Sequence, residues 1–576
     1  MPKVYAQSGP SLPASQQPRA VRVSTLSLLY TLGYVVNLGI IPFKAYLSEP
    51  LPWALGPAFP ASSLDPSTDA FATTAYTALS TTFNNVTVPS GVAFTRDGAS
   101  NAYLLRYVVA LPTEGDAACV KYMHYFPGAL LYSRAMAAFV CDFVARNASA
   151  RTQTLSYSCQ QNRQANVVFS VICTWVELTE DATMSTYTVY HAGQQLESQW
   201  FSWLKFGVRC GLSGFILHAL WHLYYRHYIP LVHNLRTVGI HPKRRLYTIQ
   251  MGDPTWLILS HPFVSFVMAV DTFVNAGYGV IAVNRASQVT NLIEFGLGCL
   301  YGSRTVGIQF SVISMNSIHE QVWAAYMTMR FATPFIKFMH WEEYFEPVDA
   351  GLMTLTASIQ AGPVMYLLTR TPIVSRFQLL QSIAAPAALQ PHATEGSPGF
   401  LTFLAIMVGI PVVNSMVSQW FSRRQKKHTP CPISKFASVR FNDWKHRLLL
   451  HWHHRRRYDG QQVGDGGVEA GGTMYQLFET NPRYKQFPLV STRGSDCFVV
   501  SWDEVTNERC QIRLSLLHAL DFQPKSPEIA IHKCPTAHTA SAMGYFDHKL
   551  CGPTTQPCPH TVTVVHLGAN HCQWVA

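Results

Sequence analysis

The residues with the clearest capacity for chemistry are ionisable side chains that stand inside long apolar runs. Asp271 follows a run of aromatic and aliphatic residues, and the other candidates have similar surroundings. An ionisable group in apolar surroundings is expensive to bury, so it normally has a specific partner or a functional role. The four candidates for a polar site are Asp271, His261, Glu294 and Arg304. The alternative for Asp271 is a polar contact between two helices.

Cysteines and sequons mark a second region with predictable chemistry. Four of the thirteen cysteines fall between residues 119 and 173, and the only two Asn-X-Ser/Thr sequons start at Asn85 and Asn147. An even set of cysteines beside glycosylation sequons is typical of a module that folds in an oxidising compartment. We therefore predict two disulfides and two glycans here, with the three possible pairings left open. The cysteines are Cys119, Cys141, Cys159 and Cys173.

The end of the chain is rich in cysteine and histidine. Four cysteines are weak zinc candidates, because their spacing lacks the short CxxC or HxxxH steps that make a zinc site specific. They are Cys534, Cys551, Cys558 and Cys572. We expect reduced core thiols here, or a disulfide set if this region lies outside the cell.

No motif for nucleotide binding, zinc-dependent proteolysis or a hydrolase nucleophile occurs in a suitable context. We therefore expect no cofactor, and we consider an enzyme less well supported than a binding protein.

The composition favours a membrane protein. Only 13% of the 576 residues are charged and 48% are apolar, and the run from Phe400 to Phe421 is long enough to cross a hydrocarbon core of about 30 Å. The fold class that this predicts is a polytopic α-helical membrane protein with an α+β extracellular or luminal module and a mainly β C-terminal module. About six transmembrane helices are expected, or seven if the amphipathic helix 322–341 crosses as well.

The predicted boundaries follow from composition and charge. They are a disordered cytoplasmic N-terminus over 1–23, a span over 24–46, a disulfide-bearing glycosylated module over 47–200, a span over 203–225, a basic cytoplasmic loop over 226–253, a bundle over 256–421, a basic segment and Gly-rich linker over 423–473, and a Cys/His-rich cytoplasmic module over 475–576.

Basic side chains cluster after the last predicted span. Lys and Arg at this position are attracted to anionic lipid headgroups, which we favour over nucleic acid as a partner. The residues are Arg423, Arg424, Lys426, Lys427, Arg455, Arg456 and Arg457.

Three function classes fit these features. The first is a cell-surface receptor, sensor or adhesion protein in a plasma or endolysosomal membrane, with an extracellular ligand and a homo-oligomer as further expectations. The order of elements over residues 24–421 also resembles the layout of polycystin and mucolipin cation channels, which would imply a pore loop over 370–398. The third class is a transporter or lipid-handling membrane enzyme that uses the polar candidates.

Overall fold

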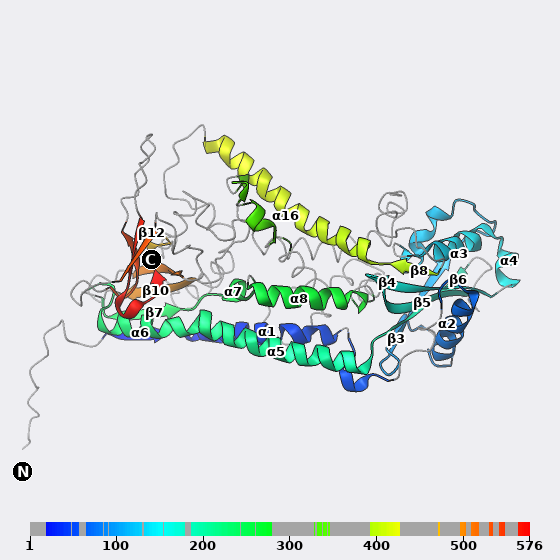
Figure 1. The fold of residues 1–576 in the computed structure, drawn as a ribbon, viewed down its shortest axis with the longest axis horizontal. Coiled ribbons are helices and arrows are strands. Elements are labelled where there is room, and N and C mark those ends of the chain that lie inside the picture. The colour runs from blue at the N-terminus through cyan, green and yellow to red at the C-terminus, as the bar shows by residue number, and fades with distance from the viewer. Residues whose placement is uncertain are drawn as a thin grey trace, which may run out of the picture.

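The computed structural model describes residues 19–278 apart from short gaps, together with 392–426, 496–502, 509–517, 529–533, 541–547 and 563–576 and a few positions between them. The molecule is elongated, with one β-sheet at each end and helices running between them (Figure 1). The C-terminus lies in the sheet at one end, and the two disulfides lie at the other.

The first sheet belongs to what we call the disulfide module. Its order is β2-β3-β6-β5-β4-β8, antiparallel except for the parallel pair β4–β8. The strands are β2 (Phe94–Asp97), β3 (Ala102–Ala110), β4 (Ser156–Gln164), β5 (Val167–Leu178), β6 (Thr186–Gln195) and β8 (Ala393–Glu395). The helices are α2 (Asp69–Thr82), α3 (Arg134–Ala145) and α4 (Ala148–Gln153), with short 3-10 turns at Cys119–Lys121 and Met123–Tyr125.

Both faces of this sheet are covered. On one face, Phe71 and Leu79 of α2 pack against Trp175 and Ala192. On the opposite face, Met136 and Val140 of α3 pack with Val176, Tyr187 and Val189. Alternation along the strands explains the two layers, since neighbouring residues of a strand point to opposite faces.

The second sheet forms the core of the C-terminal module, and its strands come from distant parts of the chain. Its order is β1-β7-β10-β11-β15, with β9 (Ala470–Gly471) also paired to β11. The bounds are β1 (Ala20–Val23), β7 (Leu246–Gln250), β10 (Asp496–Trp502), β11 (Arg509–Leu516) and β15 (Trp574–Val575). A smaller sheet has the order β12-β14-β13, from Ile529–Lys533, Thr563–Leu567 and Tyr545–Asp547. A 3-10 turn, η13 (Ala569–His571), precedes β15.

Two predicted segments have a different role in the structure. Residues 20–23, expected in a disordered N-terminus, form β1 and pair with β7. Residues 226–253, expected as a basic loop, contain η7 (Tyr225–His227), α6 (Tyr228–Thr237) and β7. The apolar residues of these segments explain the difference, because Tyr228, Leu231 and Ile249 are buried in the core of the C-terminal module.

Each connecting helix starts from a strand. Helix α1 (Thr25–Gly39) follows β1 and leads to η1 (Ile41–Leu47) and η2 (Pro52–Ala54), whereas α5 (Gln199–Leu223) follows β6. Helices α7 (Thr255–Leu259) and α8 (Pro262–Val274) follow β7, and α16 (Ser397–Lys426) follows β8. Helices α1, α5 and α8 therefore run between the two ends of the molecule (Figure 1).

The predicted membrane architecture is wrong. Among the helices that the structure describes, none combines the length and the apolar character needed to cross a membrane. The first predicted span is a helix of 15 residues followed by a 3-10 helix, and at about 1.5 Å per residue it is too short. The fold class of about six or seven spans, and the integral-membrane location derived from it, are therefore not supported.

Breaks and charges explain why the apolar runs misled the prediction. The run 256–283 is divided into α7, with five residues, and α8, with thirteen. Helix α5 is 25 residues long but contains Lys205 and Arg209, and α16 contains Pro411. The predicted spans 291–313 and 350–369, and most of the helix 322–341, lie outside the described residues.

Candidate functional site

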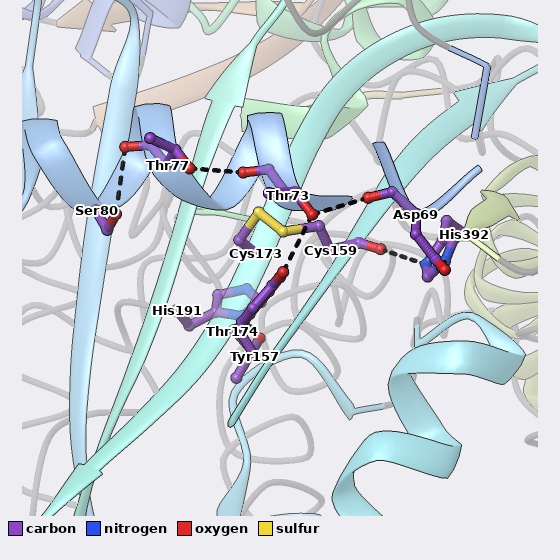
Figure 2. The surroundings of a disulfide bond; sticks show 10 residues. All are labelled: Asp69, Thr73, Thr77, Ser80, Tyr157, Cys159, Cys173, Thr174, His191 and His392. Carbon is purple, nitrogen blue, oxygen red and sulfur yellow. Dashed lines mark hydrogen bonds and ion pairs between the residues drawn. A yellow bond between two sulfur atoms is a disulfide. The ribbon is translucent and has the colours of Figure 1, made fainter. Parts of the chain in front are cut away.

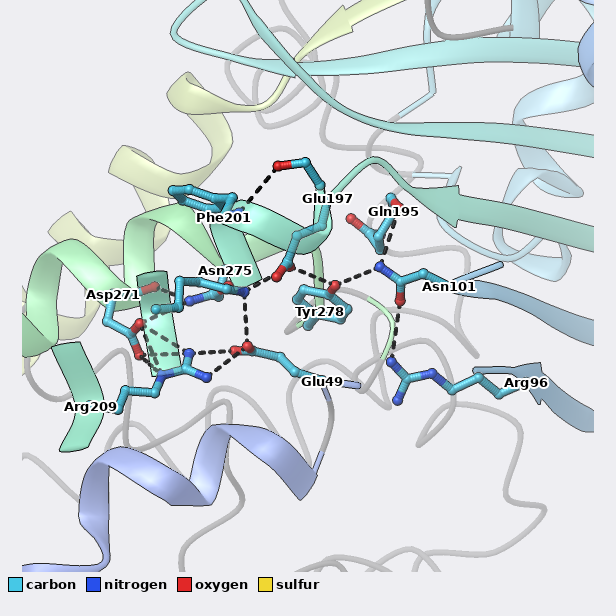
Figure 3. A network of polar contacts seen from close by, with 12 residues as sticks. Glu49, Arg96, Asn101, Gln195, Glu197, Phe201, Arg209, Asp271, Asn275 and Tyr278 are labelled. Atoms are coloured by element: carbon cyan, nitrogen blue, oxygen red, sulfur yellow. Dashed lines mark hydrogen bonds and ion pairs between the residues drawn. The ribbon is translucent and has the colours of Figure 1, made fainter. Parts of the chain in front are cut away.

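A network of buried charges lies where the disulfide module meets the helices (Figure 3). We call it the junction network. Its charged members come from the segment after η1, the turn before α5, α5 itself and α8. They are Glu49, Glu197, Lys205, Arg209 and Asp271.

Arg209 contacts two carboxylates. Its Nη1 and Nη2 donate to the two carboxylate oxygens of Glu49, both at 2.8 Å. Its Nη2 and Nε donate to Asp271 at 3.0 and 3.3 Å. The guanidinium fork is thus matched to Glu49, and Asp271 receives the longer and less direct contacts.

Lys205 donates to three acceptors on three different segments of the chain. Its Nζ lies 3.0 Å from Oε2 of Glu49, 2.7 Å from Oε2 of Glu197 and 2.8 Å from Oδ1 of Asn275. An ammonium has three protons and no acceptor, so this arrangement satisfies it fully. The side chain is 6% exposed, and such burial is tolerated only with complete pairing.

Uncharged groups extend the network into the sheet. The hydroxyl of Tyr278 donates to Oε2 of Glu197 at 2.9 Å and accepts from Nδ2 of Asn101 at 2.7 Å. Asn101 also donates to the backbone carbonyl of Gln195 at 3.2 Å. Asn101 and Gln195 stand at neighbouring ends of β3 and β6 (Figure 3), so polar contacts run without a gap from these strand ends to α5 and α8.

Local sequence places these side chains. The hydroxyl of Ser198 accepts from the backbone N–H of Phe201 and starts α5 directly after Glu197. Lys205 and Arg209 follow four residues apart, and Asp271 and Asn275 have the same spacing at the end of α8. Residues four apart lie on one face of a helix, so each helix presents a polar pair to the other.

The network contains three carboxylates and two cations, and the pKa values of two of the carboxylates shift in opposite directions. Burial alone would raise the pKa of Glu49, but Arg209 and Lys205 outweigh it and lower that pKa. Burial raises the pKa of Asp271, and Arg209 does not fully compensate it. The surroundings therefore favour the charged form of Glu49 and the neutral form of Asp271.

A second polar cluster surrounds the disulfide Cys159–Cys173, which joins β4 and β5 (Figure 2). Nδ1 of His191 lies 2.9 Å from Oγ1 of Thr174, and desolvation lowers the pKa of His191 to about 3. The imidazole of His392, just before β8, lies 3.9 Å from Asp69 and 3.1 Å from the carbonyl of Cys159. These contacts hold β8 beside α2.

The four predicted cysteines do form two disulfides, Cys119–Cys141 and Cys159–Cys173. Asn147 is exposed, and its Oδ1 accepts from the backbone N–H of Ala150. Its glycosylation stays a prediction, and Asn85 lies outside the described residues.

Of the two polar candidates that the structure describes, Asp271 belongs to the junction network and His261 lies elsewhere. His261 occupies the N-cap position of α8, where its ring contacts Phe215 with centroids 5.1 Å apart. Glu294 and Arg304 lie outside the described residues.

The predicted zinc and lipid sites are mostly beyond the described part of the chain. Cys572 is a buried free thiol in the core of the C-terminal module, and within the described ranges no cluster of metal ligands occurs. Cys534, Cys551 and Cys558 lie outside those ranges. So do Lys427, Arg455, Arg456 and Arg457, and the side chains of Arg423, Arg424 and Lys426 at the end of α16.

Sequence reasoning missed Glu49, Glu197, Lys205 and Arg209. A signal for two of them was present, since Lys205 and Arg209 interrupt an apolar helix just as Asp271 does. The same rule that selected Asp271 would have selected both residues, and Arg209 is the partner of Asp271 in the structure.

Comparison of the chain with protein-family models, with curated proteins and with solved structures finds no match. The site is therefore interpreted from its own geometry.

Proposed function

We propose that this chain is a receptor or sensor protein in which the disulfide module recognises a ligand and the helices carry the bound state to the C-terminal module. The observation that carries the proposal is the junction network, since it joins the strand ends of the recognising sheet to helices that start from or end at the other sheet.

The path along α5 supports this role. The helix starts two residues after Glu197, and Tyr224 directly after it is buried in the core of the C-terminal module. The hydroxyl of Tyr224 donates to the backbone carbonyl of Asp496 at 3.1 Å and lies 2.7 Å from the hydroxyl of Tyr228. A single rigid element therefore has polar anchors in both modules.

Buried charges make the junction suitable for a two-state response. Moving the sheet edge away from α5 would separate Lys205 from Glu197 and break the shorter of the two ion pairs of this buried ammonium. Such a loss is strongly unfavourable, so the sheet and the helix are expected to move together. This coupling is what a sensor needs to pass a local change over a long distance.

The test replaces Lys205 with Met and follows amide hydrogen exchange in both modules. We expect faster exchange at the junction and also in β10 and β11, because the perturbation travels along α5. Lys121→Met is the matched control, since Lys121 is an exposed lysine of the disulfide module whose ammonium lies 3.7 Å from Asp116. Faster exchange confined to the junction in Lys205→Met would contradict the proposed coupling.

A further inference from the structure

Helix α5 has an inverted distribution of side chains. In its first half, Lys205 and Arg209 are buried, whereas Trp203, Leu204 and Val208 are each about half exposed. A helix on the surface of a water-soluble protein has the opposite arrangement, with apolar residues inside and charges outside. The inversion is favourable only where the outer surroundings are less polar than water.

The two helices that pack on α5 also expose apolar side chains. Helix α1 exposes Leu28, Leu29 and Leu32, and α8 exposes Phe263 and Phe266. Both helices contact α5. We call the exposed apolar side chains of α1, α5 and α8 the outer face. It joins three elements, which exceeds the scattered apolar residues usual on a monomer.

Tryptophans stand at both ends of the outer face. Trp203 lies near the start of α5 and contacts Trp53, with ring centroids 6.1 Å apart, and Trp221 lies near the helix end. The two positions on α5 are separated by about 27 Å, at about 1.5 Å per residue. Indole rings favour boundaries between apolar and wet surroundings.

We propose that the outer face contacts the acyl chains of a phospholipid surface. Lipid fits better than a second copy of the chain, because the exposed side chains lie on three helices and the tryptophans bound them at two ends. A second copy would cover one patch. This inference goes beyond the proposed receptor role, since it concerns the surroundings of the helices and not the ligand of the disulfide module.

The experiment compares two substitutions of exposed valines in the full chain. Val208→Glu places a charge in the outer face, and Val108→Glu is the matched control on β3 of the disulfide module, where Val108 is 69% exposed. With phosphatidylcholine vesicles, we expect the floating fraction to fall several-fold for Val208→Glu and to be unchanged for Val108→Glu. Circular dichroism checks that both variants fold.

A second readout keeps the proposal falsifiable if Val208→Glu does not fold. Vesicles with brominated acyl chains should quench the fluorescence of the wild-type tryptophans, and Trp221→Phe should reduce the quenched amplitude. Absence of quenching would overturn the proposal. So would a wild-type dimer that forms without lipid and that Val208→Glu converts to a monomer, because a second copy would then cover the outer face. Neither result bears on the hydrogen exchange that tests the receptor role.

Discussion

The two β modules solve the same problem of stability in different ways. In the disulfide module, five of the six strands come from residues 94–195. One disulfide joins β4 to β5, and the other joins the 3-10 turn Cys119–Lys121 to α3. The C-terminal module collects strands that start at residues 20, 246, 496, 509 and 574, and its described cysteines Cys497, Cys510 and Cys572 are buried free thiols.

The difference between the modules shows how a fold compensates for the entropy cost of joining segments that are far apart in the sequence. Contacts between distant segments carry a larger loop-closure cost, and the C-terminal module offsets it by burying large side chains and one ion pair. Trp574 is fully buried against Tyr228, with centroids 5.0 Å apart, and Nε of Arg513 donates to Asp496 at 2.7 Å. We therefore expect the C-terminal module to depend on single core residues and the disulfide module on its covalent links.

Removal of Trp574 should give the largest effect. Trp574→Ala leaves a cavity among Tyr224, Tyr228 and Cys572, and also removes the hydrogen bond from Nε1 to the carbonyl of His227. We expect a loss of about 4 kcal/mol in the free energy of unfolding of the C-terminal module. Chemical denaturation measures it, with Trp200→Ala, at a 72% exposed position, as the control. An equal loss in both variants would contradict the importance of this core.

The disulfide Cys159–Cys173 should come next. Its replacement by two alanines opens a loop with a sequence separation of 14 and should cost about 3 kcal/mol. Hydrogen exchange should become faster in β4 and β5, whereas Cys497 and Cys572 should stay protected from alkylation. Alkylation of these thiols in the folded variant would show that the two modules do not differ as we describe.

The junction network offers a contrast between two carboxylates. Glu49→Gln should cost about 2 kcal/mol at neutral pH, because a charge that Arg209 stabilises is lost. Asp271→Asn should leave stability unchanged or higher, because the folded pKa of Asp271 is raised and its charge is a cost above that pKa. Thermal unfolding between pH 4 and 8 tests this difference.

The sign follows from proton linkage. The stabilisation from Glu49, whose folded pKa is lowered, is present above its unfolded pKa and is lost in acid, so the deficit of Glu49→Gln should shrink there. The cost of the Asp271 charge disappears as pH falls through its folded pKa, so any gain of Asp271→Asn should also shrink in acid. A large deficit in Asp271→Asn at neutral pH would contradict this assignment.

At neutral pH His191 should give the smallest effect, because its contribution appears only as the pH falls, and it should be confined to the disulfide module. Its folded pKa of about 3 lies below the ordinary value of 6.5, so the unfolded chain binds the proton more tightly. Stability should therefore fall as pH decreases from about 6.5 towards 3, by up to about 1 kcal/mol per pH unit. His191→Gln should lack this part of the slope in acid unfolding monitored by near-ultraviolet circular dichroism.

Much of the local organisation could be predicted from residue types. The four cysteines between residues 119 and 173 and the unusual position of Asp271 were both visible in the sequence. These features depend on neighbours along the chain or on the cost of burying one group, which residue types report directly.

Tertiary structure decided what the apolar segments do. Their length suggested membrane spans, but α7 ends at Leu259 and α8 begins only at Pro262, and α1 gives way to a 3-10 helix at Ile41. Composition sums over a run and does not record where the backbone breaks, and such breaks are set by packing against partners elsewhere. The pairing of β1 with β7 across more than 200 residues is of the same kind.

The sequence by itself identified the residues that need a partner: the cysteines that pair, and Asp271, which needs a cation because it lies in an apolar run. Only the folded chain decided that this cation is Arg209. The same guanidinium also pairs with Glu49, which lies far from Asp271 in the sequence. The physical reason is that a desolvation cost is a property of one residue, whereas its compensation depends on which distant residues the fold brings within hydrogen-bonding distance.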